Sequence, residues 1–429
     1  MLTASKKVIN AWAMYDWANS SYSLIISSAI FPTYYTSIAP AQVTMLGRTF
    51  DRTSLASYSI SLSFLIIAIL SPILSSMADY QGNKKAFMKF FCYLGSLACV
   101  CMFFFTKDNL GFGLICSIIA SIGYCGSIVF YNAYLPEIAS EADQDRVSAK
   151  GFALGYLGSV LQMIVCLAFI MMNEQLHWGL GALPVKVTFL SVGLWWAGFA
   201  QITFRELPKS KKPDQRPQHS IFTNGFYELK KVWTQMKAYP SLKRFLLSFF
   251  FFNMGVQTVM YLSVYFAADE LKMKSAQLII TILIIQLVAI AGAYLFSIIS
   301  KKTSNTYALM LLILVWIGIC IAAYYTYTPN QFYGLATAVG LVMGGIQSLS
   351  RSTYSKLLPE TTDTASYFSF YDVCDKVGTV LGTLSFGFVG ESLGGMRNSV
   401  LSVMGFFIVG LVLLMFLRNT EKKSAIAAV

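Results

Sequence analysis

Residues 11–36 read AWAMYDWANSSYSLIISSAIFPTYYT, an apolar run long enough to cross a lipid bilayer as a helix. The run contains Asp16 and Asn19, whose spacing puts both side chains on one helical face with Tyr15 and Tyr22 nearby. Because a carboxylate in hydrocarbon costs about 3 kcal/mol or more, this face should line a cavity. The alternative is a capping or interfacial role, since Asp16 lies only about 8 Å from the start of the run.

The whole chain has the composition of a membrane protein. Of its 429 residues, 56% are hydrophobic and 12% are charged, about half the charged fraction of a soluble domain. The formal net charge is +12, but the basic residues lie in short loops between apolar runs and do not form one basic face. We therefore expect a protein that spans the lipid bilayer, binds no nucleic acid and acts as a monomer.

The residues needed for metal or hydrolytic chemistry are scarce. The chain has only two histidines, and its eight cysteines fall in predicted spans without CxxC spacing. Metal sites and general acid–base catalysis usually draw on clustered imidazoles, thiolates or carboxylates. We expect no metal, no cofactor, no disulfide and no enzymatic activity.

Hydropathy averaged over about 19 residues predicts twelve membrane spans. They lie near 11–36, 57–78, 87–106, 112–135, 151–172, 186–204, 245–268, 276–300, 306–326, 332–354, 365–389 and 398–417. The eleventh is the least regular, because Asp372, Asp375 and Lys376 interrupt it. The pattern predicts an all-α polytopic membrane protein with two six-helix bundles, at 1–204 and 245–429.

A polar, basic linker at 205–244 separates the two predicted bundles. Its first part, RELPKSKKPDQRPQHS, contains three prolines that exclude a continuous helix. Its second part predicts a short amphipathic helix with Phe226, Leu229, Trp233 and Met236 on one side. This helix would lie on the membrane surface or dock against the protein.

The distribution of basic residues predicts the orientation. With both termini in the cytoplasm, inside segments contain 24 of the 32 Lys and Arg residues. Outside loops contain seven, and Lys376 lies within a span. The positive-inside rule favours this arrangement, and we expect the bacterial cytoplasmic (inner) membrane as the location.

The two halves share a short motif at equivalent places. Leu-Pro-Glu closes the fourth span at 135–137 and the tenth span at 358–360. The span that follows opens with GxxxG in both cases, at Gly151/Gly155 and Gly378/Gly382. This repetition indicates an internal duplication, and small residues at that spacing favour close helix packing.

Polar side chains concentrate in eight of the twelve spans. The third, sixth, ninth and twelfth spans contain only Lys89 and Gln201, both near cytoplasmic ends. Since polar groups in lipid are costly, the bare spans should face lipid and the others should surround an aqueous cavity. The polar residues in those others are Asp16, Asn19, Asn132, Gln162, Asn253, Gln257, Gln286, Gln347, Arg351, Asp372, Asp375 and Lys376.

Two six-helix halves joined by a basic loop resemble the major facilitator superfamily over the whole chain. The loop between the second and third spans also resembles the superfamily motif GxxxD(R/K)xGR(R/K), reading Ser75, Asp79, Tyr80, Gly82, Asn83, Lys84 and Lys85. The resemblance implies that this loop stabilises an outward-facing state, with Asp79 at the start of the eleventh helix. The corresponding loop of the second half, 299–305, keeps only Lys301 and Lys302.

Four further stretches resemble the Atg22-like branch of the superfamily. They are AWAMYDWANSSY at 11–22, FYNAYLPEIA at 130–139 with RVSAKGFALGYLG at 146–158, FFFFNMGVQT at 249–258, and GGIQSLSRSTYSKLLPE at 344–360. Eukaryotic relatives are linked to amino-acid export from the vacuole. The branch's pattern leads us to expect an acid beside Asn253, where this chain has Met254.

The resemblance implies that the halves rock about a central site near mid-membrane. We expect substrate contacts from Asp16, Asn19, Gln162, Asn253, Gln257 and Gln286, with the neutral amides forming a site above a charged cytoplasmic gate. The expected gating residues are Asn132, Gln347, Arg351, Asp372, Lys376, Asp79, Gly82 and Lys84. Lys376 would pair with Asp372 along its helix or with Asp16 across the halves, and protonation of Asp16 would then couple transport to protons.

These features predict a secondary transporter of a small polar solute, with amino acids as candidates. The 15% aromatic content leaves open an exporter of hydrophobic drugs or lipids. A membrane scaffold or receptor that moves no solute is a third reading. In that case changes in the linker, and not in the polar spans, would abolish function.

Overall fold

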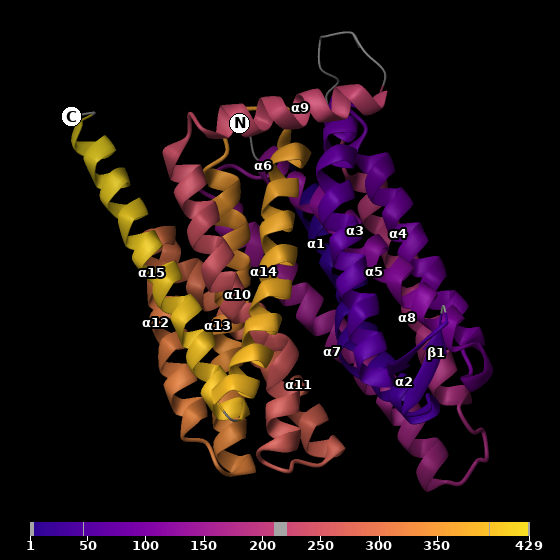
Figure 1. Ribbon diagram of the computed structural model, residues 1–429. Helices are drawn as coiled ribbons and strands as arrows, with labels where there is room; N and C mark the ends of the chain where they lie inside the picture. The colour runs from indigo at the N-terminus through magenta and orange to yellow at the C-terminus, as the bar shows by residue number, and fades with distance from the viewer. Residues whose placement is uncertain (1–3, 46, 210–220, 394, 428–429) are drawn as a thin grey trace.

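The computed structural model describes residues 4–45, 47–209, 221–393 and 395–427, which form a bundle of long helices (Figure 1). The first membrane crossing consists of α1 (Lys6–Ser21), a π-helical segment η1 (Tyr22–Ile30) and α2 (Phe31–Ile38) in succession. Pro32 follows the π segment and cannot donate a backbone hydrogen bond. Ser28 Oγ donates to the carbonyl of Ser23 at 2.9 Å, five residues earlier. The wide turns therefore occur where proline disturbs the α-helical ladder.

The remaining crossings are single helices. They are α3 (Arg52–Gln81), α4 (Lys84–Cys101), α5 (Leu110–Ala133), α7 (Gln144–Gln175), α8 (Leu183–Glu206), α10 (Pro240–Asp269), α11 (Ser275–Lys302), α12 (Asn305–Tyr324), α13 (Pro329–Lys356), α14 (Thr364–Leu393) and α15 (Met396–Ala427). Ten helices among the described residues are long and apolar enough to cross a membrane. The first crossing, which η1 divides, and α14 complete the predicted set of twelve. The irregular eleventh span is therefore a continuous helix.

The helices up to α8 form one half of the molecule and those from α10 onward form the other. The halves meet along α7 with α11 and α13, and along α14 with α3 and α5. The four helices with few polar residues, α4, α8, α12 and α15, lie at the periphery (Figure 1). They carry exposed large apolar side chains such as Phe90, Leu97, Leu194, Leu314 and Phe416. The expectation that every third helix is peripheral is confirmed, and the exposed apolar side chains agree with the prediction that these helices face lipid.

The glycines of the GxxxG pairs lie where helices of one half approach each other closely. A Cβ at Gly155 on α7 would collide with Ser20 on α1, and one at Gly382 on α14 would collide with Thr258 on α10. Because α1 and α10 occupy equivalent places in the two halves, the same contact occurs twice. The predicted packing role of these glycines is confirmed.

Two features lie at opposite ends of the bundle. At one end lies an antiparallel hairpin of β1 (Gln42–Met45) and β2 (Arg48–Asp51), which is an exception to the all-α prediction. Gly47 supplies the positive φ of +74° at the turn of this hairpin. We call this the hairpin end. The start of α1, the end of α15 and the linker helix α9 (Ile221–Met236) lie at the other end, which we call the terminal end (Figure 1).

Helix α9 is the predicted amphipathic helix, and it docks against the protein. Val232 and Met236 are buried against the bundle, whereas Trp233 is more than half exposed and contacts Phe370 with its ring. The helix contacts α3 of the first half and α14 of the second. Of the predicted apolar face, the side chains of Phe226 and Leu229 lie outside the described residues, as do residues 210–220 of the linker.

Candidate functional site

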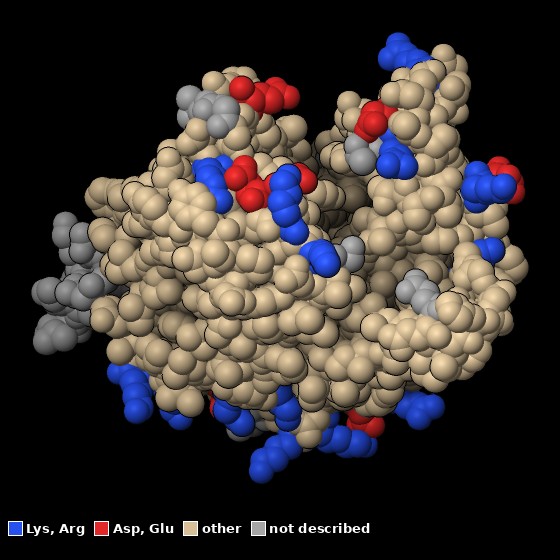
Figure 2. All heavy atoms as spheres, turned by 90° about the horizontal axis from the view of Figure 1, so that it is seen from below, with Lys and Arg blue, Asp and Glu red and all other residues tan. Residues whose placement is uncertain are grey.

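Two connected cavities lie between the halves. The outer cavity has a volume of about 860 Å³ and reaches the hairpin end, where Figure 2 shows a hollow between two lobes. Its lining is rich in hydroxyl groups and aromatic rings, including Tyr22, Ser28, Ser63, Ser121, Tyr261, Thr281, Phe332 and Thr383. The inner cavity, of about 220 Å³, lies deeper. Six residues line both: Leu24, Phe64, Met260, Tyr261, Gln286 and Thr379.

Most of the predicted site residues come together around the inner cavity. Its lining includes Asp16, Asn132, Asn253, Gln257, Gln286, Gln347, Arg351, Asp372, Asp375 and Lys376. These residues come from α1, α5, α10, α11, α13 and α14, so both halves contribute. The residues expected to bind substrate and those expected to form a gate therefore share one cavity.

Arg351 on α13 reaches into the other half and forms the central contact between the halves. Its Nη1 lies 3.2 Å from Asp16 Oδ2 and 3.3 Å from Asn132 Oδ1. Its Nε and Nη2 donate to the hydroxyl and carbonyl oxygens of Ser148, each at 2.9 Å. Tyr131 donates its hydroxyl to the same Asp16 oxygen at 2.8 Å. Because both charges are buried, these hydrogen bonds offset a large desolvation cost.

Aromatic rings and a glycine shape the space around Arg351. The guanidinium carbon lies 4.9 Å from the ring centre of Trp12 and 4.2 Å from that of Phe152, which are cation–π distances. Gly151 faces the ion pair, since a Cβ there would lie 2.5 Å from Asp16 Oδ2 and 2.9 Å from Arg351 Nη2. The absence of a side chain at Gly151 therefore leaves room for the ion pair.

Lys376 does not pair with Asp16, and that prediction is wrong. Its Nζ lies 2.6 Å from Asp375 Oδ2 and 3.7 Å from Asp372 Oδ1, all on α14. The place beside Asp16 is taken by Arg351. The predicted alternative, pairing of Lys376 with Asp372, is present as the longer of the two contacts.

Asp375 changes the character of the predicted amide site. Asn253 Nδ2 and Gln257 Nε2, one turn apart on α10, donate to its Oδ1 at 2.7 and 2.8 Å. The two amides are therefore engaged by a carboxylate, and the expected neutral site is charged. Asp375 also supplies the acid expected beside Asn253, but from α14 instead of from position 254.

Two predicted substrate residues lie away from both cavities. Asn19 is fully buried and accepts a long hydrogen bond of 3.5 Å from Ser20. Gln162 on α7 donates to Ser191 on α8 at 3.4 Å, within the first half. Neither residue contributes to the lining of either cavity. Hydropathy placed both in polar helices, but it does not give the rotation of a helix about its axis.

The loop motif between α3 and α4 joins the halves at the terminal end. Asp79 accepts hydrogen bonds from the backbone N–H groups of Ala365 and Ser366, at 3.2 and 2.7 Å, and from the Ser366 hydroxyl. These groups belong to the first turn of α14, where the helix dipole favours an anion. The contact implied for Asp79 is present.

The glycine and lysine of the same motif support this contact. Gly82 adopts a positive φ of +61°, which turns the chain from α3 into α4. Lys84 Nζ lies 3.3 Å from Asp79 Oδ1, pairs with Glu137 and donates to Thr364 Oγ1 at 2.6 Å. Glu137 is the acid of the Leu-Pro-Glu motif.

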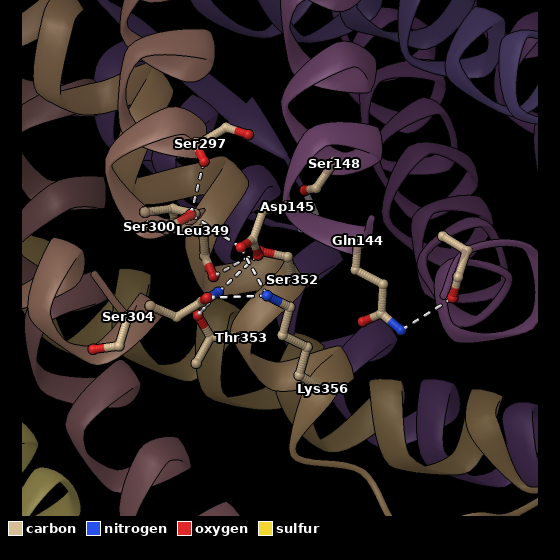
Figure 3. A network of polar contacts seen from close by, with 12 residues as sticks. Gln144, Asp145, Ser148, Ser297, Ser300, Ser304, Leu349, Ser352, Thr353 and Lys356 are labelled. Atoms are coloured by element: carbon tan, nitrogen blue, oxygen red, sulfur yellow. Dashed lines mark hydrogen bonds and ion pairs between the residues drawn. The ribbon is translucent and has the colours of Figure 1, made fainter. Parts of the chain in front are cut away.

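A second network joins the halves at the terminal end, and sequence reasoning missed it (Figure 3). Asp145, in the first turn of α7, accepts from Ser300 Oγ at 2.9 Å and Asn305 Nδ2 at 2.7 Å, and pairs with Lys356 Nζ at 2.7 Å. Asn305 Nδ2 also donates to Thr353 at 3.0 Å. The partners belong to α11, α12 and α13, so the acid here comes from a first-half helix and not from the loop at 299–305.

Comparison with known proteins now places the chain in a family. A family model described as "Vacuole effluxer Atg22 like" matches residues 4–427. The MFS-type transporter YxiO of Bacillus subtilis (strain 168) is 31% identical over 426 residues, covering 97% of this chain and 96% of that protein. The chain belongs to the Atg22-like family. Autophagy-related protein 22-1 of Aspergillus terreus is 24% identical, covering 89% of this chain and 77% of that protein.

Solved structures similar to this Atg22-like protein share its fold. FucP in the outward conformation has a TM-score of 0.69 at 13% identity, covering 96% of this chain and 97% of that one. A bacterial homologue of the iron transporter ferroportin, in an outward-facing state, has a TM-score of 0.67 at 9% identity, covering 96% of this chain and 98% of that one. The protein is therefore an integral membrane transporter of the major facilitator type and not an enzyme.

In this Atg22-like fold the two ends of the space between the halves differ. One end of the space between the halves is wide, and the other is crossed by hydrogen bonds and ion pairs.

Asp375 and Asp145 were not among the predicted site residues. Asp375 was expected as a polar residue of the eleventh span without a role of its own, and Asp145 is an acid just before the fifth span. The partners Asn253 and Ser300 lie more than 100 residues away along the chain.

Proposed function

We propose that this protein is an alternating-access transporter of a small polar solute, with its cavity accessible from outside the cell and sealed toward the cytoplasm. The observation that carries the proposal is the asymmetry of the space between the halves. The cavity widens toward the hairpin end, while Asp79, Asp145 and Arg351 bridge the halves toward the terminal end. Transport would then require these bridges to break as the halves rock.

The assignment of the two ends follows from the basic residues. The seven Lys and Arg residues expected outside lie at the hairpin end, either in the connections there or in the first turns of α3, α8 and α15: Arg48, Arg52, Lys107, Lys186, Lys272, Lys274 and Arg397. By the positive-inside rule we assign the terminal end, with both termini and α9, to the cytoplasm. The similarity to a Bacillus subtilis protein supports a bacterial cytoplasmic membrane.

We assign the inner cavity to the solute and the bridges to the gate. Charges of both signs line the cavity, which suits a zwitterion such as an amino acid better than a hydrophobic drug or a lipid tail.

Asp16 belongs to the gate through Arg351, and Asn132, Gln347, Lys84 and Gly82 act with it. Protonation of Asp16 would remove the charge that holds Arg351, which gives a route to proton coupling. The family description as an effluxer supports export.

Purified protein in liposomes, tested with a panel of amino acids and metabolites, would test the proposal. We expect exchange of at least one small polar solute, and accumulation that depends on a pH gradient. In a D16A variant, exchange should fall by about tenfold or more, because the remaining Arg351 charge is buried without its partner. The E141Q variant, at an exposed position of the terminal end, is the matched control.

Two results would contradict this assignment. Transport unaffected by D16A would reject proton coupling through Asp16. A protein that moves no solute in the panel, but loses its cellular function when the linker is changed, would be a membrane scaffold or receptor.

A further inference from the structure

The inner cavity contains one carboxylate more than its basic groups can neutralise. Asp16 pairs with Arg351 at 3.2 Å, and Asp375 pairs with Lys376 at 2.6 Å. Asp375 also accepts from the amides of Asn253 and Gln257. The remaining charged group of the lining is Asp372, whose nearest basic atom is Lys376 Nζ at 3.7 Å.

Asp372 is buried without a full set of partners. Its side chain is only 6% exposed, and among the described residues its Oδ2 atom has no hydrogen-bond donor. A buried carboxylate oxygen without a donor is costly, so such groups usually bind a ligand, an ion or a proton. Asp16 accepts hydrogen bonds from Tyr131 and Arg351, and Asp375 accepts them from Asn253 and Gln257. Among the described residues, Asp372 is the acid of this cavity that has a fully buried oxygen without a donor.

Two other acceptors in the same cavity are also unused. Ser350 on α13 is buried, and its Oγ has no hydrogen-bond partner among the described residues. Gln286 on α11, which lines both cavities, has an unpartnered Oε1. A primary ammonium group has three N–H donors and no acceptor, so it matches one carboxylate and two neutral oxygens.

We propose that Asp372 binds the protonated amino group of the transported solute in the inner cavity, with Gln286 and Ser350 as its neutral acceptors. This inference rests on the proposed transport function and names the chemical group that the site selects. The inner cavity, at about 220 Å³, accommodates a head group. The rest of the solute extends into the hydroxyl-lined and aromatic outer cavity. The site therefore selects for a single positive charge and tolerates variation in the attached chain.

Binding to the purified full-length protein tests the proposal independently of transport. The probes are L-leucine, isopentylamine, which keeps the ammonium but lacks the carboxylate, and 4-methylpentanoate, which lacks the amine. Ethanolamine and ethylene glycol form a second matched pair. Each is titrated against the melting temperature of the protein in detergent and against its tryptophan fluorescence, with NaCl replaced by choline chloride in a parallel series.

We expect the amine of each set to raise the melting temperature and the partner without an amine to have no effect. The D372N variant should bind the amines about tenfold or more weakly, because a hydrogen bond to a charged group is lost, and D372E should restore part of the affinity. The D108N variant, the same change at an exposed position of the hairpin end, should bind like the parent protein.

Several outcomes would overturn the proposal. Equal binding of amines and their matched partners, or no binding of any amine, would show that the site does not select an ammonium group. Stabilisation by sodium alone would assign Asp372 to a metal cation. Amine binding that persists in D372N, with loss only of pH-driven accumulation, would assign it to a proton. Failure of transport with intact, Asp372-dependent amine binding would contradict the proposed function and not this inference.

Discussion

The space beside Gly151 is occupied by the two charged side chains that join the halves, the carboxylate of Asp16 and the guanidinium of Arg351. Each is individually expensive to bury, and together with Tyr131, Asn132 and Ser148 they form a satisfied network. Because glycine has no side chain, Gly151 leaves the space that this buried ion pair needs.

We predict that G151A separates Asp16 from Arg351, because the added methyl group would lie 2.5 Å from the carboxylate oxygen. The expected cost is about 2 kcal/mol or more, measured as a lower melting temperature together with slower solute exchange. Gly198 on α8 is the control, since a Cβ there meets no atom within 4 Å. A G151A protein with the melting temperature and exchange rate of G198A would show that the contact tolerates the methyl group.

Among the elements, α9 is the one that links both halves from outside the membrane-spanning bundle. Its own residues Val232 and Met236 are buried against the bundle. Lys231 of α9 pairs with Asp363 at 3.3 Å, and Tyr367 donates to Gln235 of α9 at 3.4 Å. The linker is thus folded onto the terminal ends of α3 and α14. Its attachment depends on a small number of apolar contacts.

We predict that V232D undocks α9, because burying an unpaired aspartate costs several kcal/mol. Trypsin should then cleave the exposed lysines of α9 about tenfold faster than in the parent protein, as followed by gel electrophoresis. The T234D variant introduces the same charge at an exposed position of the same helix and should be cleaved at the parent rate. Equal cleavage of V232D and T234D would mean that Val232 does not hold the helix.

The sequence predicted the helices and their environment better than it predicted partners. Hydropathy identified α4, α8, α12 and α15 as lipid-facing, because a bare apolar surface is visible in composition alone. It did not identify Arg351 as the partner of Asp16, or Asp375 as the acceptor for Asn253, because these contacts depend on how helices are rotated and brought together. The contact of Asp79 with the start of α14 was expected from the resemblance of its loop to the superfamily motif, and hydropathy alone would not have given it.

For the whole molecule, the proposed alternating-access cycle makes the balance of contacts at the two ends decide which side the cavity faces. The terminal end is held by Asp79 at the start of α14, by Asp145 with Lys356, and by Arg351 with Asp16. A difference of a few kcal/mol in these contacts is enough to reverse the populations of two states.

We predict that D79N combined with D145N shifts the protein toward a state closed at the hairpin end. Ser28 lines the outer cavity, so an S28C reporter should react with a membrane-impermeant maleimide about tenfold more slowly in the double variant. S28C with E141Q, which changes an exposed acid at the terminal end, should keep the parent rate. Unchanged labelling of the double variant would show that these two bridges do not set the equilibrium.

Because Arg351 is provided by the second half and seated among residues of the first, neither half can complete its own interior. A first half synthesised alone would expose an unmatched acid and an empty aromatic pocket to lipid or to chaperones. A second half alone would carry Arg351 without the carboxylate of Asp16 that pairs with it in the whole protein. Joining the two halves therefore also pairs two buried charges that neither half can neutralise by this contact on its own.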